Sequence, residues 1–286
     1  MPHLSELQRK HADDGVTIIG VTREDPNNSL EDVRKMTADK GDTMDYTVAF
    51  DDGGKTYDAY MKAAGQRGIP TAFIVDKTGH IAFIGHPMAM DLPLAMVAAG
   101  TWDPETSPKE IAELQKMSRE IRIGASRVTA ESAAGLLEQV AEFKRRWPSQ
   151  AETIRSAEYT ILVAAGKHAE AGALGRELVA EAVEAQDANA LNAIAWGIVD
   201  PAVEQDHRDV SLALWAAEVA ANLTEHEDPA ILDTLARAHF WIGGYARAHE
   251  LQRKAVAIVE ADPKNWTGFA EGLKAALDEY AKLVKE

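Results

Sequence analysis

The sequence of 286 residues contains no cysteine. Disulfide bonds, thiolate metal sites and cysteine nucleophiles are therefore excluded for this chain. No segment approaches the roughly 20 consecutive apolar residues that a membrane-spanning helix needs. No signal peptide is visible where the printed sequence begins, so the chain as written is expected to be cytoplasmic.

Basic residues are in the minority, because 30 Lys and Arg stand against 46 Asp and Glu and give a formal net charge of −16. Such a chain repels phosphate groups, so neither nucleic acid nor an anionic membrane surface is an expected partner. Basic peptides remain open as partners. The length favours two domains, and an apolar content of 46% is ordinary for a globular protein.

Several motifs of known chemistry are missing, among them Gly-x-Ser-x-Gly, Ser-x-x-Lys, His-Glu-x-x-His and a phosphate-binding glycine loop. We expect no cofactor and no metal. His86, Met88 and Met90 could supply a soft-metal site, but the interpretation we favour is a strand end followed by a buried loop.

The first hundred residues alternate β-branched runs with amphipathic helical segments. A helix capped by Asn28 and Ser29 is predicted to begin at Leu30 and to end at Gly41. Another is predicted over residues 3–13. Strands are predicted at Val16–Thr22, Tyr46–Phe50, Ala72–Asp76 and His80–Gly85. This order indicates an α/β domain over residues 1–103.

The most specific stretch is Gly68-Ile69-Pro70-Thr71, which runs into the strand Ala72-Phe73-Ile74-Val75-Asp76 and is followed by Gly79 and Ile84-Gly85. It resembles the redoxin branch of the thioredoxin superfamily, which includes exported thiol-disulfide oxidoreductases and peroxiredoxins. The resemblance covers residues 1 to about 103. It implies a thioredoxin-like fold and a cis peptide before Pro70. It also implies that Ile69, Pro70 and Thr71 face the family's active-site dithiol.

The sequence departs from that family at its beginning. The family's central strand and its Trp-Cys-x-x-Cys motif are missing, and Met1 runs directly into the helix that follows them. Thiol exchange needs a thiolate, so the family's chemistry does not carry over to this chain. Without the central strand, the strands beginning at Val16 and Thr71 each have an unpaired edge. We expect them to pair directly or to be bridged by a partner chain, and we expect a homodimer through these edges.

Residues 104–286 show no strand pattern, and the turn-rich segment Trp102–Pro108 marks the boundary. Ala171, Ala213 and Ala248 recur at intervals of 42 and 35 residues, near the period of about 34 in tetratricopeptide repeats. The segment Leu235–Ala255 resembles such a repeat most clearly. The predicted fold class is therefore α/β plus all-α, with an incomplete thioredoxin-like domain followed by a tetratricopeptide-like helical-hairpin domain.

Aromatic residues are spread through the helical half. Aromatics along a helical array can line a concave peptide groove, although they more often belong to the core. The candidate groove residues are Trp196, Trp215, Trp241 and Tyr245.

Three functional hypotheses follow. The first is a redox-inactive module that binds a protein or peptide. The second is a fragment of an exported thiol-disulfide oxidoreductase, periplasmic or membrane-tethered, whose Cys-x-x-Cys lies upstream. The third is a hydrolase with a histidine and carboxylate site in a cleft between the two halves, with His80 and His86 as candidate cleft residues. The first two rank equally and ahead of the third, so enzymatic activity stays open while dithiol activity of this chain is excluded.

Overall fold

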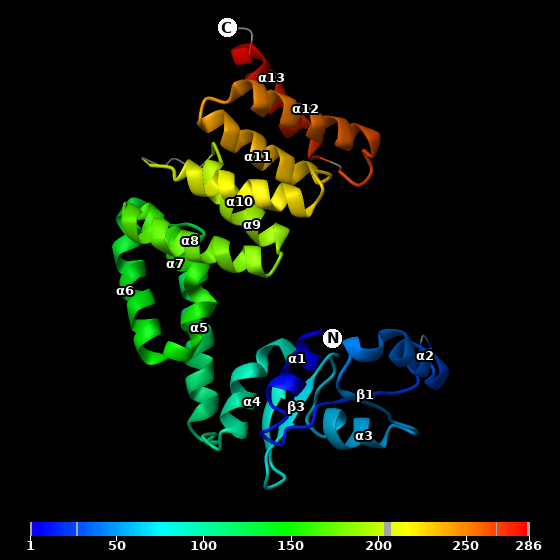
Figure 1. The fold of residues 1–286 in the computed structure, drawn as a ribbon. Coiled ribbons are helices and arrows are strands. Elements are labelled where there is room, and N and C mark those ends of the chain that lie inside the picture. Colours follow the sequence, from blue (N-terminus) through cyan, green and yellow to red (C-terminus); the bar gives the residue numbers. More distant parts are fainter. Residues whose placement is uncertain (1, 27, 203–206, 267, 285–286) are drawn as a thin grey trace. The chain divides into compact units, whose positions relative to one another are not determined.

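The computed structural model describes residues 2–26, 28–202, 207–266 and 268–284. The chain divides into two compact units, residues 1–113 and 114–286. The division lies within helix α5 (Ser107–Ala125), downstream of the predicted boundary after Asp103, because the first turns of this continuous helix group with the first unit. Within the described residues the first unit is α/β and the second is helical, as the sequence predicts (Figure 1).

Four short strands form two separate sheets in the described part of the first unit. Strand β1 (Ile19–Thr22) pairs with β2 (Thr47–Phe50) in parallel, with Ile19 opposite Thr47. Strand β3 (Ala72–Val75) pairs with β4 (Ile81–Gly85) in antiparallel fashion. Of the two arrangements expected for the first and third strands, direct pairing is wrong, since no ladder joins β1 to β3, and bridging by a partner chain stays a prediction.

The helices of the first unit begin and end where local chemistry directs them. Ser29 and Asp32 form a reciprocal capping box at the start of α2 (Leu30–Lys40), and Gly41 follows its last residue with a φ of +46°, as predicted. The other helical segments are α1 (Pro2–Lys10), α3 (Lys55–Tyr57), a π turn (Asp58–Lys62), α4 (Asp91–Ala98) and 3₁₀ turns at Gly41–Thr43 and Pro87–Ala89.

Helix α1 connects the two sheets through its two faces. Leu7 is buried with Ile74 of β3 and Leu94 of α4 in the core of the unit. On another face, the Ser5 hydroxyl donates to Thr43 O at 3.2 Å and accepts from Asp45 N at 3.0 Å, just before β2.

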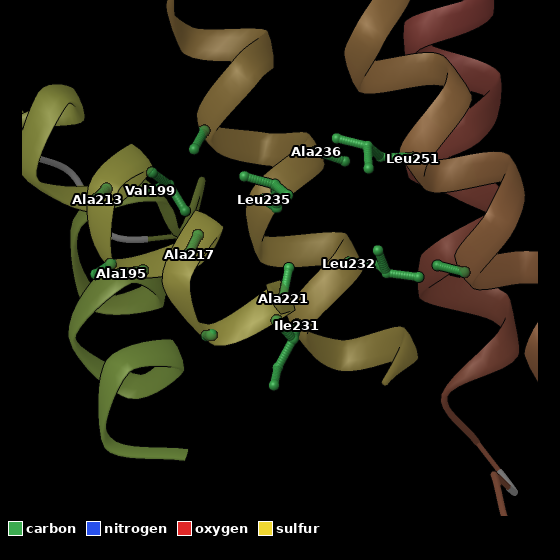
Figure 2. Packing of buried hydrophobic residues seen from close by; sticks show 14 of the residues in the cluster. Ala195, Val199, Ala213, Ala217, Ala221, Ile231, Leu232, Leu235, Ala236 and Leu251 are labelled. Carbon is green, nitrogen blue, oxygen red and sulfur yellow. The ribbon is translucent and has the colours of Figure 1, made fainter. Parts of the chain in front are cut away.

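The second unit consists of helices that pack mainly on their neighbours in the chain. Alanines of α10 lie beside larger side chains of α11, so that the two helices approach closely (Figure 2). The predicted helices are confirmed, while their assignment to tetratricopeptide repeats stays a prediction. No helix in the described ranges is long and apolar enough to cross a membrane. The elements are α6 (Ala130–Arg146), a 3₁₀ segment (Pro148–Ile154), α7 (Arg155–Ala164), α8 (His168–Glu184), α9 (Ala188–Val199), α10 (Val210–Leu223), α11 (Pro229–Trp241), α12 (Tyr245–Ala261) and α13 (Ala270–Val284).

Candidate functional site

The candidate site of the first unit is the pair of strand edges on β1 and β3 that have no partner strand in the described structure. The direction of the main chain in β1 can be read from one hydrogen bond, Asp51 N to Thr22 O at 2.8 Å, which points Thr22 toward β2. Main-chain groups of successive residues in a strand point to opposite sides. Those of Ile19 and Val21 therefore point away from β2, toward the free edge. The main-chain groups at an unpaired strand edge can form a ladder with another strand, so this edge can accept one.

The same edge carries exposed apolar side chains. Ile19 is 54% exposed and Val21 is 50% exposed, although both are β-branched residues that usually pack against neighbouring strands. On β3, Val75 is 44% exposed. Both strands therefore present apolar surface to solvent together with an unpaired edge.

The segment just before β1 and strand β3 pack into one core, although β1 and β3 are not hydrogen-bonded to each other. Val16 and Ile18, just before β1, pack against the same buried cluster as Ala72 of β3, and Leu7 of α1 lies in that cluster. Strand β3 and the segment before β1 are thus both held against α1. This packing holds the unit together without a direct β1–β3 ladder.

The segment Gly68–Thr71 lies directly before β3. Its Ile69–Pro70 peptide is cis, as the family resemblance implies. Ile69 is 85% exposed, and the Thr71 hydroxyl donates to Gly68 O at 2.7 Å. The segment therefore presents an exposed apolar side chain directly before β3.

The two candidate histidines lie at opposite ends of β4. The Nδ1 atom of His80 is 2.7 Å from the Thr78 hydroxyl in the hairpin turn, where hydrogen bonds from Thr78 and from His80 N hold the pKa of the Asp76 carboxyl below its ordinary value. His86 Nδ1 accepts from Met88 N at 3.2 Å. A strand of this length separates the histidines by roughly 20 Å, so the structure does not bring them together.

The alternative soft-metal set is not assembled either. Met90 is buried in the core of the first unit, whereas Met88 is 67% exposed, so the two sulfur-bearing side chains occupy different environments. Across the part of the chain that the structure describes, no group of three or more histidine and carboxylate side chains is placed to hold a metal ion.

The four candidate groove residues have different surroundings in the second unit. Trp196 packs against the core. The indole nitrogen of Trp241 donates to Val199 O at 2.9 Å and so satisfies a carbonyl at the end of α9. Tyr245 packs 5.6 Å from the ring of Phe240. Trp215, which is 40% exposed, is left as the strongest candidate for contact with a partner.

The sequence did not reveal the polar residues that bind α1 to the segments before β1 and β2. Gln8 donates to Val16 O at 2.9 Å and accepts from Ile18 N at 2.6 Å, while Ser5 binds the segment before β2. The available signal was the placement of Ser5 and Gln8 three residues apart on the helix, next to the apolar positions Leu4 and Leu7.

Comparison with known proteins supports the predicted nature of the first unit. Residues 1–84 match the AhpC/TSA family. Over 103 residues the chain is 29% identical to Protein FixW of Rhizobium leguminosarum, a match that covers 35% of this chain and 47% of that protein. The chain thus spans about half the length of this curated relative. No solved structure matches it significantly. The matches support a redoxin-type, thioredoxin-like region and give no support to the hydrolase hypothesis.

Proposed function

We propose that the first unit is the scaffold of a thiol-disulfide redox domain whose strand and Cys-x-x-Cys motif are supplied from outside this sequence. The observation that carries the proposal is the split sheet, in which β1 and β3 each have a free edge while β3 and the segment before β1 share a core. A strand added between them would pair with the main chain of Ile19 and Val21 and would shield their exposed side chains.

In this proposal the present chain positions the reacting groups and donates no electrons itself. The dithiol of the added segment would be oxidised to a disulfide while a substrate disulfide is reduced to two thiols. The family resemblance implies that Ile69, Pro70 and Thr71 face that dithiol. The exposure of Ile69 suits this segment to contact with an extended peptide substrate. Export of the complete redox protein is part of the same proposal.

The test is to supply the missing segment in trans. A synthetic peptide with an apolar, β-branched strand followed by Trp-Cys-x-x-Cys is mixed with the chain, and reduction of a protein disulfide is followed. We expect faster reduction than with the peptide alone, and no reduction when serine replaces both cysteines of the peptide. A rate that the chain leaves unchanged would argue against the proposal.

A second copy of the chain is the competing occupant of the free edges. Sedimentation velocity distinguishes the two, because a homodimer through the edges should dissociate when the strand peptide binds. If the dimer persists in saturating peptide and disulfide reduction is no faster than with the peptide alone, self-association is the favoured role of these edges.

For the second unit we propose a protein or peptide partner that contacts Trp215. The support is its exposure of 40%, since tryptophan is enriched at the centres of protein interfaces. The test compares the binding of basic model peptides by the Trp215→Ala variant with their binding by the wild-type chain. Intrinsic fluorescence is not the readout, because the signal of Trp215 cannot be separated from that of the other tryptophans. Equal retention of basic model peptides by both would remove Trp215 from the proposal.

A further inference from the structure

Two histidines that are distant in sequence meet in the second unit. His168 is the first residue of α8, and His207 lies shortly before α10. Their ring centroids are 4.8 Å apart and their planes are inclined by 50°. Both side chains are exposed, so dissolved ions have access to them.

The separation matches two imidazoles bound to one metal ion. Zinc binds histidine nitrogen at about 2.0–2.1 Å, and the ring centroid lies about 1.1 Å beyond that nitrogen, so each centroid is about 3.2 Å from the ion. With nitrogen–metal–nitrogen angles between about 90° and about 109°, two such centroids are about 4.5–5.2 Å apart. The observed 4.8 Å lies inside this interval.

The charged side chains near the pair make contacts of their own. Asp209 follows His207 closely, and its Oδ1 atom accepts from Leu212 N at 3.1 Å, which caps α10. The other oxygen, Oδ2, lies 3.6 Å from the position that a Cβ on Gly172 would occupy, one turn after His168 on α8. An Arg176 guanidinium nitrogen approaches the same position to 3.3 Å, so the two opposite charges offset each other and the proposed site depends on the two imidazoles.

We propose that His168 and His207 form a two-histidine site for a divalent transition-metal ion of the Zn²⁺, Ni²⁺ or Cu²⁺ class. Imidazole is a preferred ligand for these ions. Within the described ranges no third histidine or carboxylate joins the pair, so the two imidazoles are the protein ligands of the proposed site in these ranges. The bound ion links the start of α8 to the segment before α10 and stabilises the folded second unit, since the unfolded chain does not hold the two rings together.

The test titrates the whole chain with ZnCl₂ and, separately, NiCl₂, using calorimetry for affinity and circular dichroism for the melting temperature. Loss of an outer-shell partner alone weakens metal binding about 10- to 100-fold, so removing a direct ligand should weaken it at least about tenfold. We expect this loss in His168→Ala and in His207→Ala, together with loss of the metal-dependent rise in melting temperature.

The matched control is His226→Ala, because His226 lies in the same unit and contacts Asn222 at 3.1 Å rather than another histidine. This variant should bind metal as the wild type does. Dichroism without metal checks that each variant is folded. The proposal is overturned if the chain binds neither ion, or if His168→Ala and His207→Ala bind as tightly as His226→Ala.

Discussion

The side-chain oxygen of Gln8 accepts a hydrogen bond from the main-chain N–H of Ile18 at 2.6 Å, and its amide nitrogen donates to Val16 O at 2.9 Å. Ile18 directly precedes β1. The amide of Gln8 thus supplies hydrogen-bond partners to the main chain of the segment that leads into β1. Helix α1 is thereby fixed to β1 by hydrogen bonds and to β3 by Leu7.

Removing this amide should loosen β1. Gln8→Ala leaves two main-chain groups without their protein partner, and each lost hydrogen bond costs about 1 kcal/mol. We expect the Ile18 amide to exchange with solvent faster in native-state hydrogen exchange. Glu6→Ala, on an exposed position of the same helix, is the control. Equal protection of Ile18 in both variants would show that Gln8 does not fix the strand.

Trp241 and Trp215 are a matched pair, because they are 41% and 40% exposed. Only Trp241 has its indole N–H bonded to Val199 O, and the guanidinium of Arg208 lies 4.7 Å above its ring. Trp241→Phe should therefore destabilise the second unit by about 1 kcal/mol, from the lost hydrogen bond and a weaker cation–π contact. Trp215→Phe should stay within about 0.5 kcal/mol of the wild type in urea unfolding. Equal effects would contradict the capping role of Trp241.

Tyr280 is fully buried, and its hydroxyl has no hydrogen-bond partner among the residues that the structure describes. Burial raises the pKa of this phenol above its ordinary value. Its ring stacks on Phe240 at 5.0 Å, a contact that phenylalanine keeps. Tyr280→Phe should therefore be neutral or stabilising by up to about 1 kcal/mol, whereas Tyr280→Ala should cost about 3–5 kcal/mol. A clear loss of stability in Tyr280→Phe would mean that the hydroxyl has a partner in solution.

Asp233 should make stability fall with rising pH. Burial raises its pKa above 3.8, against the opposing effects of the Gln252 hydrogen bond and the Arg237 charge. Between 3.8 and the raised pKa, the folded state keeps a proton that the unfolded state has released. The free energy of unfolding therefore decreases across this interval as pH increases, and the decrease is complete above the raised pKa.

The Asp233→Asn variant lacks this proton and should gain stability relative to the wild type across the same interval. Urea unfolding followed from about pH 3.5 to about pH 7 measures the difference. The asparagine keeps an oxygen that can accept from Gln252 Nε2, which bonds Asp233 at 2.7 Å. A stability difference that does not change with pH would contradict the raised pKa.

Local features were predictable from the sequence, and pairing between distant segments was not. The capping of α2 by Ser29 and its end at Gly41 depend on neighbouring residues, so both could be read directly. Whether β1 and β3 pair is a question about segments far apart in the chain, and strand composition alone does not encode it.

The candidate sites show the same difference between local features, which the sequence predicts, and tertiary contacts, which it does not. Trp241 and Trp215 look alike in the sequence, and only the tertiary structure separates the tryptophan that caps α9 from the exposed one. His168 and His207 belong to different helical hairpins, so their meeting depends on packing that periodicity does not predict. The cis Pro70, by contrast, was implied by a continuous motif.

The most direct test of the proposed role is hydrogen exchange at the free edge of β1. The amides of Ile19 and Val21 should exchange rapidly in the chain alone and at least about tenfold more slowly with a strand peptide whose cysteines are replaced by serine. Val21→Pro removes one of these donors without removing a β1–β2 hydrogen bond, and should abolish the protection. Unchanged exchange of both amides in saturating peptide would contradict the account that this edge receives the strand of a redox domain.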